Sequence, residues 1–205
     1  TAWFWGNGGY GGTGLSNTTQ YSSPTQVPGT WDNSNEKLGG LQHAFWVIKT
    51  NGTLWTWGRN NTNQLGQGNQ TEYSSPRQVG TDTTWSRVQS VTYHYMIATK
   101  TDGTLWSWGT NTGGVLGQNN TTQYNSPRQI GTGTDWGTPG DRKFDGEYLQ
   151  AGAIKTDGTL WAWGSNPSGP LGNNSNQNQS SPIQVPGSWN TIDFGREHSY
   201  GTKNI

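Results

Sequence analysis

The ten residues KTDGTLWSWG, Lys100–Gly109, return almost unchanged as KTDGTLWAWG at 155–164 and as KTNGTLWTWG at 49–58. In each copy an Asp-Gly or Asn-Gly pair separates two short stretches of strand-forming residues. Such a pair is the strongest short signal for a tight turn between antiparallel strands. We therefore expect each copy to form a β-hairpin whose second strand carries the motif Trp-x-Trp-Gly.

These hairpins belong to a longer unit that occurs four times. The second Trp of the motif lies at intervals of 52, 51 and 55 residues, at Trp5, Trp57, Trp108 and Trp163. Every unit has a Gly nine positions later and a Pro nineteen positions later, and it closes with a third Trp at Trp31, Trp85, Trp136 and Trp189. A period of about fifty residues is typical of propeller and solenoid units, which bury their apolar faces only against their neighbours.

Short alternating segments, Pro-marked strand entries and Gly-rich loops fill each unit. No segment has the 3.6-residue apolar period of a helix. About four short strands per unit is the pattern of a propeller blade. We predict an all-β fold, a β-propeller of four-stranded blades with repeats of about 51–55 residues, in which residues 1–205 form a single domain. The paired Trp side chains are expected to pack blade against blade.

The composition restricts the function. Twelve Lys and Arg residues balance twelve Asp and Glu residues, so the net charge is zero, and 27% of the residues are hydrophobic. Nucleic-acid-binding domains usually carry a basic excess, and a membrane anchor needs an apolar run or a polybasic segment. Cys is absent, which excludes disulfides, thiol catalysis and thiolate metal sites. We therefore predict no nucleic-acid partner and no membrane insertion.

No sequence motif indicates catalysis. The chain has no Gly-x-Ser-x-Gly, phosphate-binding loop or His-Glu-x-x-His sequence, and its acidic residues form no recurring pair for general acid–base work. The three His residues occupy equivalent or nearly equivalent repeat positions, which favours a structural role. We predict a protein that is not an enzyme and that needs no cofactor or metal.

A lysine also recurs beside each hairpin, at Lys49, Lys100, Lys155 and Lys203. Lysines that flank a strand can blunt unwanted strand pairing while remaining solvated. We expect that role here. A ring of lysines that attracts an anion on one rim is the alternative.

The repeat resembles that of the regulator of chromosome condensation family. The family pattern, Gly-x-x-His-Ser, Asp-Gly-x-Leu-Trp-x-Trp-Gly-x-Asn, Gly-x-Leu-Gly, Pro and Val, is matched over essentially the whole chain, and Gly195–Ser199 and Gly40–His43 carry its first part. In the other two copies His94 lacks the Gly, and Leu149 replaces the His. The resemblance implies a propeller, usually of seven blades. Members of the family exchange nucleotide on a small GTPase, inhibit β-lactamase, sense light or act as scaffolds.

The four units leave two arrangements open. The chain ends with HSYGTKNI, a strand that elsewhere precedes Thr-Leu-Trp, and begins with TAWFWG, a strand that elsewhere follows it. Such complementary ends fit a closed four-bladed ring that is latched by pairing of the termini. They equally fit four units of a larger, for example seven-bladed, propeller within a longer protein or completed by a partner chain.

The copies differ most in the segment after the third Trp. Insertions in repeat proteins usually map to one face, often the binding face. We expect charged residues of these segments in loops on one rim, with aromatic residues as anchors. The predicted binding residues are Asp32, Glu36, Lys37, Tyr93, Tyr95, Arg142, Lys143, Asp145, Glu147, Tyr148, Arg196 and Glu197. Solvated loops without a partner are the alternative.

The favoured function is a non-enzymatic binding or structural module that recognises a protein or a surface glycan. The polar, cysteine-free composition resembles extracellular bacterial proteins and phage surface proteins. We therefore predict an attachment or surface component of a secreted or virion assembly, such as a phage tail or capsid, with an extracellular or virion-surface location. The alternative is a regulatory protein-interaction propeller, such as a guanine-nucleotide exchange factor or a secreted enzyme inhibitor. Either module can complete its ring or assemble laterally with another chain.

Overall fold

The computed structural model describes residues 1–32, 37–91, 94–137 and 143–203. Apart from two short 3-10 turns, η1 (Gly9–Gly11) and η2 (Thr112–Gly114), the regular structure of these residues consists of strands. The strands are β1 (Ala2–Gly6), β2 (Tyr21–Val27), β3 (Leu38–Gly40), β4 (Ala44–Ile48), β5 (Leu54–Gly58), β6 (Tyr73–Gln78), β7 (Trp85–Val91), β8 (Tyr95–Lys100), β9 (Leu105–Gly109), β10 (Tyr124–Gln129), β11 (Phe144–Glu147), β12 (Gln150–Ile154), β13 (Thr159–Gly164), β14 (Gln179–Phe194) and β15 (Ser199–Lys203).

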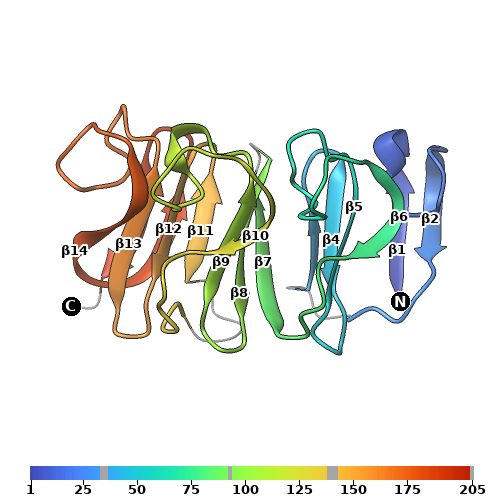
Figure 1. Ribbon diagram of the computed structural model, residues 1–205, viewed down its shortest axis with the longest axis horizontal. Coiled ribbons are helices and arrows are strands. Elements are labelled where there is room, and N and C mark those ends of the chain that lie inside the picture. The colour runs from blue at the N-terminus through green and yellow to red at the C-terminus, as the bar shows by residue number, and fades with distance from the viewer. Residues whose placement is uncertain (33–36, 92–93, 138–142, 204–205) are drawn as a thin grey trace.

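These strands form antiparallel sheets in which neighbours along the chain are neighbours in the sheet. Two sheets have four strands each, in the orders β3-β4-β5-β6 and β7-β8-β9-β10. A third sheet runs from β11 to β15, and β1 pairs with β2 alone. The sheets stand side by side in chain order (Figure 1). The prediction of an all-β fold built from propeller-type blades is confirmed.

The row of blades is open. The two ends of the chain lie at opposite ends of the row (Figure 1), and among the described residues β1 and β15 do not pair. The long strand β14 pairs with β13 through its first half and with β15 through its second half. A four-bladed ring latched by pairing of the two termini, one of the two expected arrangements, is therefore not formed.

The hydrogen bonds within Asp102–Trp106 show why the hairpin motif needs its residues. The Asp102 carboxylate accepts hydrogen bonds from the backbone N–H and the hydroxyl of Thr104, and Thr104 Oγ1 accepts a hydrogen bond from the Trp106 indole. Gly103 provides the left-handed conformation of the turn, with φ +77°. The same chain of bonds links Asn51, Thr53 and Trp55 in the second repeat. The Asp-Gly-Thr-Leu-Trp sequence is therefore a self-contained turn that orients its first Trp.

The second Trp of the motif joins one blade to the preceding one. Trp57, Trp108 and Trp163 are completely buried. Their indole N–H groups donate hydrogen bonds to carbonyl oxygens of the preceding repeat, at 3.0, 3.0 and 2.7 Å, on Gly12, Gln64 and Val115. The expected packing of blade against blade through these tryptophans is thus observed.

A glycine makes room for each of these indoles. A Cβ added at Gly66 would lie 2.9 Å from Nε1 of Trp108, and one added at Gly117 would lie 3.0 Å from Nε1 of Trp163. Both glycines also have a positive φ, +68° and +67°. The Gly found nine positions after Trp5, Trp57 and Trp108 is therefore required by the close approach of the next blade's Trp and by the backbone conformation.

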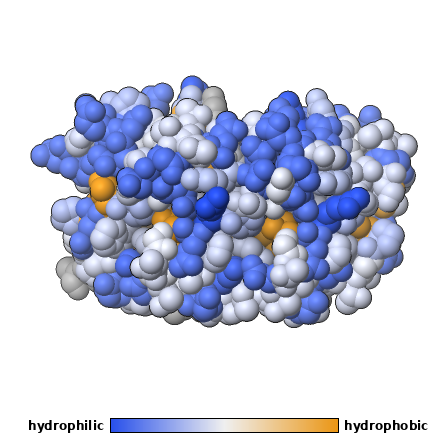
Figure 2. Space-filling view, in the orientation of Figure 1, coloured by the Kyte–Doolittle hydropathy of each residue, from blue (hydrophilic) through white to orange (hydrophobic). Residues whose placement is uncertain are grey.

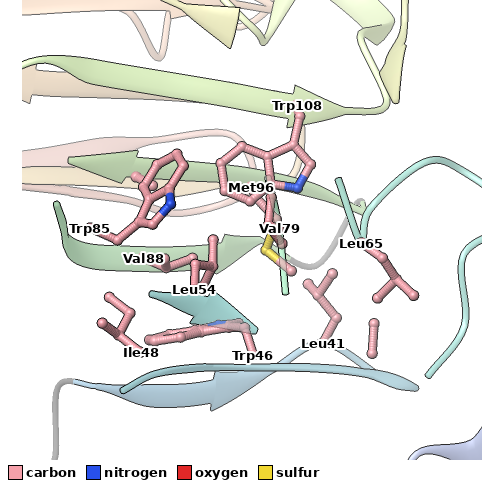
Figure 3. Packing of buried hydrophobic residues seen from close by; sticks show 12 residues of the cluster. Leu41, Trp46, Ile48, Leu54, Leu65, Val79, Trp85, Val88, Met96 and Trp108 are labelled. Atoms are coloured by element: carbon pink, nitrogen blue, oxygen red, sulfur yellow. The ribbon is translucent and has the colours of Figure 1, made fainter. Parts of the chain in front are cut away.

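Apolar clusters fill the spaces between the sheets. In one of them, Trp46 and Leu54 from the second blade face Trp85, Met96 and Trp108 from the third (Figure 3). Trp46 falls outside the repeat positions but is buried in this cluster. A packed Trp removes about 200 Å² from water, which contributes roughly 5 kcal/mol before entropy costs are subtracted. A few indoles can therefore replace many aliphatic residues.

The recurring lysines lie over the indoles at the hairpin end of each blade. Lys100 Nζ is 3.7 Å from the ring centroid of Trp106 and 4.8 Å from that of Trp85, and it also pairs with Asp82 at 2.8 Å. Lys49 is enclosed in the same way by Trp31 and Trp55. The expectation of solvated lysines is wrong for Lys100, which is buried. Its charge is held by a cation–π contact with two rings, and this contact stabilises the hairpin end.

A buried Asn organises the loop after the Trp-x-Trp-Gly motif in the last three repeats, where the first repeat has Gly8. Asn111 Oδ1 accepts a hydrogen bond from the Leu116 N–H, while its Nδ2 donates to the carbonyls of Asn120 and Thr122. Asn60 and Asn166 make equivalent contacts in their own repeats. One amide side chain therefore satisfies buried backbone groups that the loop itself leaves unpaired.

Substitution of Gly66 tests the steric role of the indole. Gly66→Ala and the control Gly80→Ala both place a side chain at positive φ, which costs about 1–2 kcal/mol, but a Cβ at Gly80 meets no atom within 4 Å. We expect Gly66→Ala to lower the free energy of unfolding by about 1–3 kcal/mol more than the control does, because Trp108 must move. Urea denaturation of both variants measures the difference. Equal losses would contradict the tight indole contact.

Candidate functional site

The predicted binding residues divide between the two ends of the blades. The hairpin end is defined by the turns Asn51–Gly52, Asp102–Gly103 and Asp157–Gly158, and the His-turn end by His43, His94, Tyr148 and Gly195–His198. Asp32, Lys37 and Lys143 lie at the hairpin end, whereas Tyr148, Arg196 and Glu197 lie at the His-turn end. The single rim expected from the sequence is not formed, because β11 runs from one end to the other. Glu36, Tyr93 and Arg142 lie outside the described residues.

Two of the predicted lysines bridge neighbouring blades. Lys37 Nζ donates a hydrogen bond to the carbonyl of Ser86 in β7, and Lys143 Nζ donates to the carbonyl of Asn190 in β14 at 2.8 Å. Both lysines directly precede the first strand of a sheet, β3 or β11. Lys37 thereby links this strand to the first strand of the next sheet, and Lys143 links it to the second half of β14, which pairs with β15.

Tyr95, expected as a surface anchor, belongs to the core. It is completely buried, and its hydroxyl donates a hydrogen bond of 2.7 Å to the carbonyl of Gln150 in the next blade. A Cβ added at Gly146 would lie 2.5 Å from this hydroxyl. Burial, followed by the charges of Asp145 and Glu147, raises the pKa of Tyr95 well above its ordinary value. The prediction failed because β8 is buried on both of its faces.

Asp145 and Glu147 face a polar hollow between β7, β11 and the second half of β14. The hollow measures about 360 Å³ and is lined by β7, β11 and β14 through residues that include Arg87, Gln89 and Asp193. Asp145 Oδ2 accepts a hydrogen bond from the Phe194 N–H at 2.8 Å. Burial raises the pKa of Asp145, with a smaller contribution from the neighbouring charges of Asp193 and Glu147.

A second group of polar and aromatic side chains, the Tyr10 cluster, lies at the His-turn end and consists of Tyr10, His43, Arg59 and His94. The Arg59 guanidinium is 5.0 Å from the ring centroid of Tyr10, and the rings of Tyr10 and His43 are 5.1 Å apart. Burial and then the charges of Arg59 and His43 lower the pKa of His94. Tyr10 is 42% exposed, so the cluster is accessible from solvent.

A similar stacking arrangement occurs two blades further along. The guanidinium of Arg196 lies 4.8 Å from the ring centroid of Tyr148. The sequence indicated both of these residues but missed Tyr10 and Arg59. Arg59 directly follows Trp-Gly, where the other copies have Asn7, Thr110 and Ser165, so a charged residue at this one position was the available signal.

The site has the character of a binding surface. Within the described ranges, no group of three or more His, Asp or Glu side chains is placed to hold a metal ion. No described helix has the length and apolar content of a membrane span. The face seen in Figure 2 is mostly hydrophilic, with apolar colour confined to small areas between the blades. Such a surface can offer charged and aromatic contacts to a partner.

Comparison with known proteins identifies related repeats. The model of the regulator of chromosome condensation (RCC1) repeat matches residues 51–98, 102–136 and 157–200, which is more than half of the chain. The chain is 26% identical over 185 residues to the ultraviolet-B receptor UVR8 of Arabidopsis thaliana, covering 88% of this chain and 41% of the receptor. It is 26% identical over 215 residues to the probable E3 ubiquitin-protein ligase HERC4 of Mus musculus, covering 98% of this chain and 20% of the ligase.

A solved structure has the same fold. The structure of yeast RCC1 (Prp20) with Kap60 bound superposes with a TM-score of 0.73 at 17% identity, covering 93% of this chain and 46% of that protein. The chain therefore spans less than half of the length of each of these three proteins. The predicted likeness to the regulator of chromosome condensation repeat is confirmed.

The predicted setting is corrected by the same findings. The relatives are named as an ultraviolet-B receptor, an E3 ubiquitin-protein ligase and a GTPase regulator homolog, which points against an extracellular or virion-surface location, so that prediction is wrong. They give no support to a phage, secreted or adhesion role, nor to a glycan partner. They favour a regulatory module that interacts with proteins, which was the alternative drawn from the sequence.

The lowered pKa of His94 predicts a dependence of stability on pH. The folded state binds fewer protons than the unfolded state, so stability falls as the pH drops through the unfolded value of 6.5. His94→Asn removes this contribution and tolerates the φ of +65° at this position. Between pH 7.5 and pH 5, roughly the range of His titration, we expect urea unfolding to show a smaller loss of stability in the variant. An equal loss of stability in the wild type and in His94→Asn over this pH range would contradict the lowered pKa of His94.

Proposed function

Because the chain belongs to the regulator of chromosome condensation (RCC1) repeat family, we propose that it is a regulatory module that binds a protein partner and performs no catalysis itself. More than half of its residues match the family repeat, and its blades superpose on a propeller that has been captured with another protein bound. A propeller fold alone does not select a function. The choice rests on the surface that the blades present.

The observation that carries the proposal is the pair of Tyr–Arg contacts at the His-turn end. Tyr and Arg are enriched at protein interfaces and supply much of their binding energy. Here Arg59 lies over Tyr10, and Arg196 lies over Tyr148. Side chains that are already stacked lose less rotamer freedom on binding than free ones. The His-turn end is therefore prepared for contact.

The chemistry of this end indicates the kind of partner. Arg59 and Arg196 give it positive charge beside the rings of Tyr10 and Tyr148. A complementary partner surface carries carboxylates that approach the guanidinium groups. We propose a protein with an acidic contact patch as the ligand of this end.

Removal of the two arginines tests the proposal. The variant Arg59→Ala/Arg196→Ala is compared with Arg77→Ala/Arg128→Ala, a matched control. Arg77 and Arg128 lie over Tyr73 and Tyr124, at 4.5 and 4.7 Å, on the outer strands β6 and β10. Proteins that copurify with the tagged wild-type chain are identified first. The amount of each that copurifies with either variant is then measured. Candidates are then titrated in purified form by calorimetry.

We expect at least one purified protein whose affinity falls about tenfold or more with the first variant, since each interface Arg contributes roughly 1 kcal/mol or more. The control variant is expected to bind as the wild type does. If every copurifying protein binds both variants equally, the partner does not use this end. If no purified protein binds at all, the proposed function is wrong.

A further inference from the structure

The Tyr10 cluster joins side chains from three successive repeats at one point of the His-turn end. Tyr10 lies in η1, in the loop after β1, and His94 directly precedes β8. His43 directly precedes β4, and Arg59 directly follows β5. The Arg59 N–H donates a hydrogen bond of 2.8 Å to the His43 carbonyl, which ties these two backbones together. The packing of the blades therefore assembles the cluster in the folded chain.

The composition of the Tyr10 cluster is not a requirement of the repeat. Thr110 and Ser165 hold the position of Arg59 in the next two repeats, and Gly113 holds the position of Tyr10 in the third repeat. A group that every blade needed would recur at every junction, as the hydrogen-bonded indoles do. The aromatic ring and the Arg therefore indicate a role beyond the packing of the blades.

Two residues of the cluster have an unfavourable backbone conformation. Tyr10 has a φ of 59° and His94 a φ of 65°, in the left-handed region that residues with a Cβ rarely adopt. Gly113, at the repeat position of Tyr10, has a φ of 70°, so a Gly meets the same backbone without strain. Strained residues of this kind concentrate at functional sites. The exposed Tyr10 is thus present against the preference of its own backbone.

The cluster gathers basic groups without an acidic partner. After burial, the charges of Arg59 and His43 lower the pKa of His94, and no described carboxylate counteracts them. Among the residues that the structure describes, the ion pairs join lysines to Asp side chains elsewhere, and none includes Arg59. The Tyr10 cluster therefore presents positive charge that the described chain does not neutralise.

The buried atoms of the cluster determine how a ligand can reach it. Nε of Arg59 and Nδ1 of His94 are enclosed and have no hydrogen-bond partner within the described chain. A ligand must therefore meet the guanidinium through its two terminal Nη groups, which can bind two oxygens of one anion. The ring of Tyr10, which is 42% exposed, lies beside the guanidinium and lines this approach.

A phosphoryl group fits this set of donors better than a carboxylate does. It carries nearly two negative charges at pH 7 and three acceptor oxygens, whereas one guanidinium already satisfies a carboxylate. The cluster offers the fixed charge of Arg59 and two imidazoles that gain protons in the pH range in which phosphate titrates. We propose that the Tyr10 cluster binds a phosphoryl group on a Ser, Thr or Tyr side chain of the protein partner. This inference rests on the proposed function and specifies the chemistry of the partner.

The second Tyr–Arg contact of the His-turn end has a different balance of charge. Glu147 directly precedes Tyr148, and Glu197 directly follows Arg196. Carboxylates beside a binding surface repel a doubly charged anion. The proposal therefore concerns the Tyr10 cluster alone.

Binding of short peptides tests the proposal before the partner is known. Capped peptides Gly-Gly-X-Gly-Gly, in which X is phosphoserine, phosphotyrosine, Glu or Ser, are titrated against the 15N-labelled chain by NMR. We expect at least one phosphopeptide to bind about tenfold tighter than the Glu peptide, since each further charge-assisted hydrogen bond contributes about that factor. If neither phosphopeptide binds tighter than the Glu peptide, the inference is overturned, whereas a partner that supplies carboxylates alone still satisfies the proposed function.

Other repeats of the chain supply the variants. Arg59→Thr introduces the residue type of Thr110, and Tyr10→Gly introduces that of Gly113, so both replacements already occur at equivalent positions. We expect each variant to lose the preference for the phosphopeptide, while the control Arg77→Thr, on the outer strand β6, keeps it. Tyr10→Gly is also expected to keep or raise the urea midpoint, because it relieves the left-handed Tyr. Lower stability with unchanged phosphopeptide binding would show that the cluster is only structural.

The ring signals of the His side chains report where the phosphoryl group binds. The chain has three His residues, so their NMR signals can be followed one by one. A bound phosphoryl group opposes the charge of Arg59 and is expected to raise the pKa of His94, which burial and Arg59 lower in the free protein. The signal of His198, in the last repeat, is expected not to move. An unchanged His94 signal at saturation with the phosphopeptide would refute binding at this cluster.

Two further probes identify the source of the phosphoryl group. These are inorganic phosphate and vesicles of phosphatidylcholine with or without a phosphoinositide. We expect the phosphopeptide to bind tighter than inorganic phosphate, because its backbone adds contacts beside Tyr10, and we expect the phosphoinositide to add no vesicle binding. Inorganic phosphate that binds as tightly as the phosphopeptide would indicate a site for the free ion. Preferential binding of the phosphoinositide vesicles would indicate a lipid site, and either result would overturn the assignment to a protein partner.

Discussion

The hydrogen-bonded insertion of one indole into the preceding blade is the contact on which the rest of this structure depends. A chain with 27% hydrophobic residues has few side chains with which to fill the space between sheets. Trp57, Trp108 and Trp163 each bring a large apolar surface and one N–H group, and each N–H has a carbonyl to bond. The same contact requires a glycine beside the indole, because a Cβ there would collide with the ring. It also requires the buried Asn, because the Asn amide holds the loop that carries the accepting carbonyl.

How much of this was predictable depends on whether a signal is local or acts between blades. The hairpins were predictable because the Asp102–Trp106 turn is closed by its own side chains. The blade period followed from the spacing of the tryptophans. The surroundings of Lys100 were not predictable, because one of its two enclosing rings and its carboxylate partner come from the preceding segment of the chain. Tyr95 was misplaced for a similar reason, since its partner carbonyl lies in the next blade.

The candidate site shows the same limit more clearly. Charged loops were expected to share one rim, but a strand of the blade separates them and places Lys143 and Tyr148 at opposite ends. Arg59 and Tyr10 come together only when two repeats are packed side by side. Composition also misled the prediction of location. The Asn, Thr and Gln residues that suggested a secreted or virion protein serve the loops of the repeat, and Asn60, Asn111 and Asn166 are buried.

Hydrogen exchange of the indole N–H groups tests the central contact most directly. In a chain with 15N-labelled tryptophan, each of the thirteen indoles gives its own signal, and transfer to D2O reports how often each N–H opens to solvent. We expect the signals of Trp57, Trp108 and Trp163 to persist longest and to disappear only with global unfolding. Exchange of these three as rapid as that of the partly exposed Trp55 would show that the blades are not joined by inserted indoles.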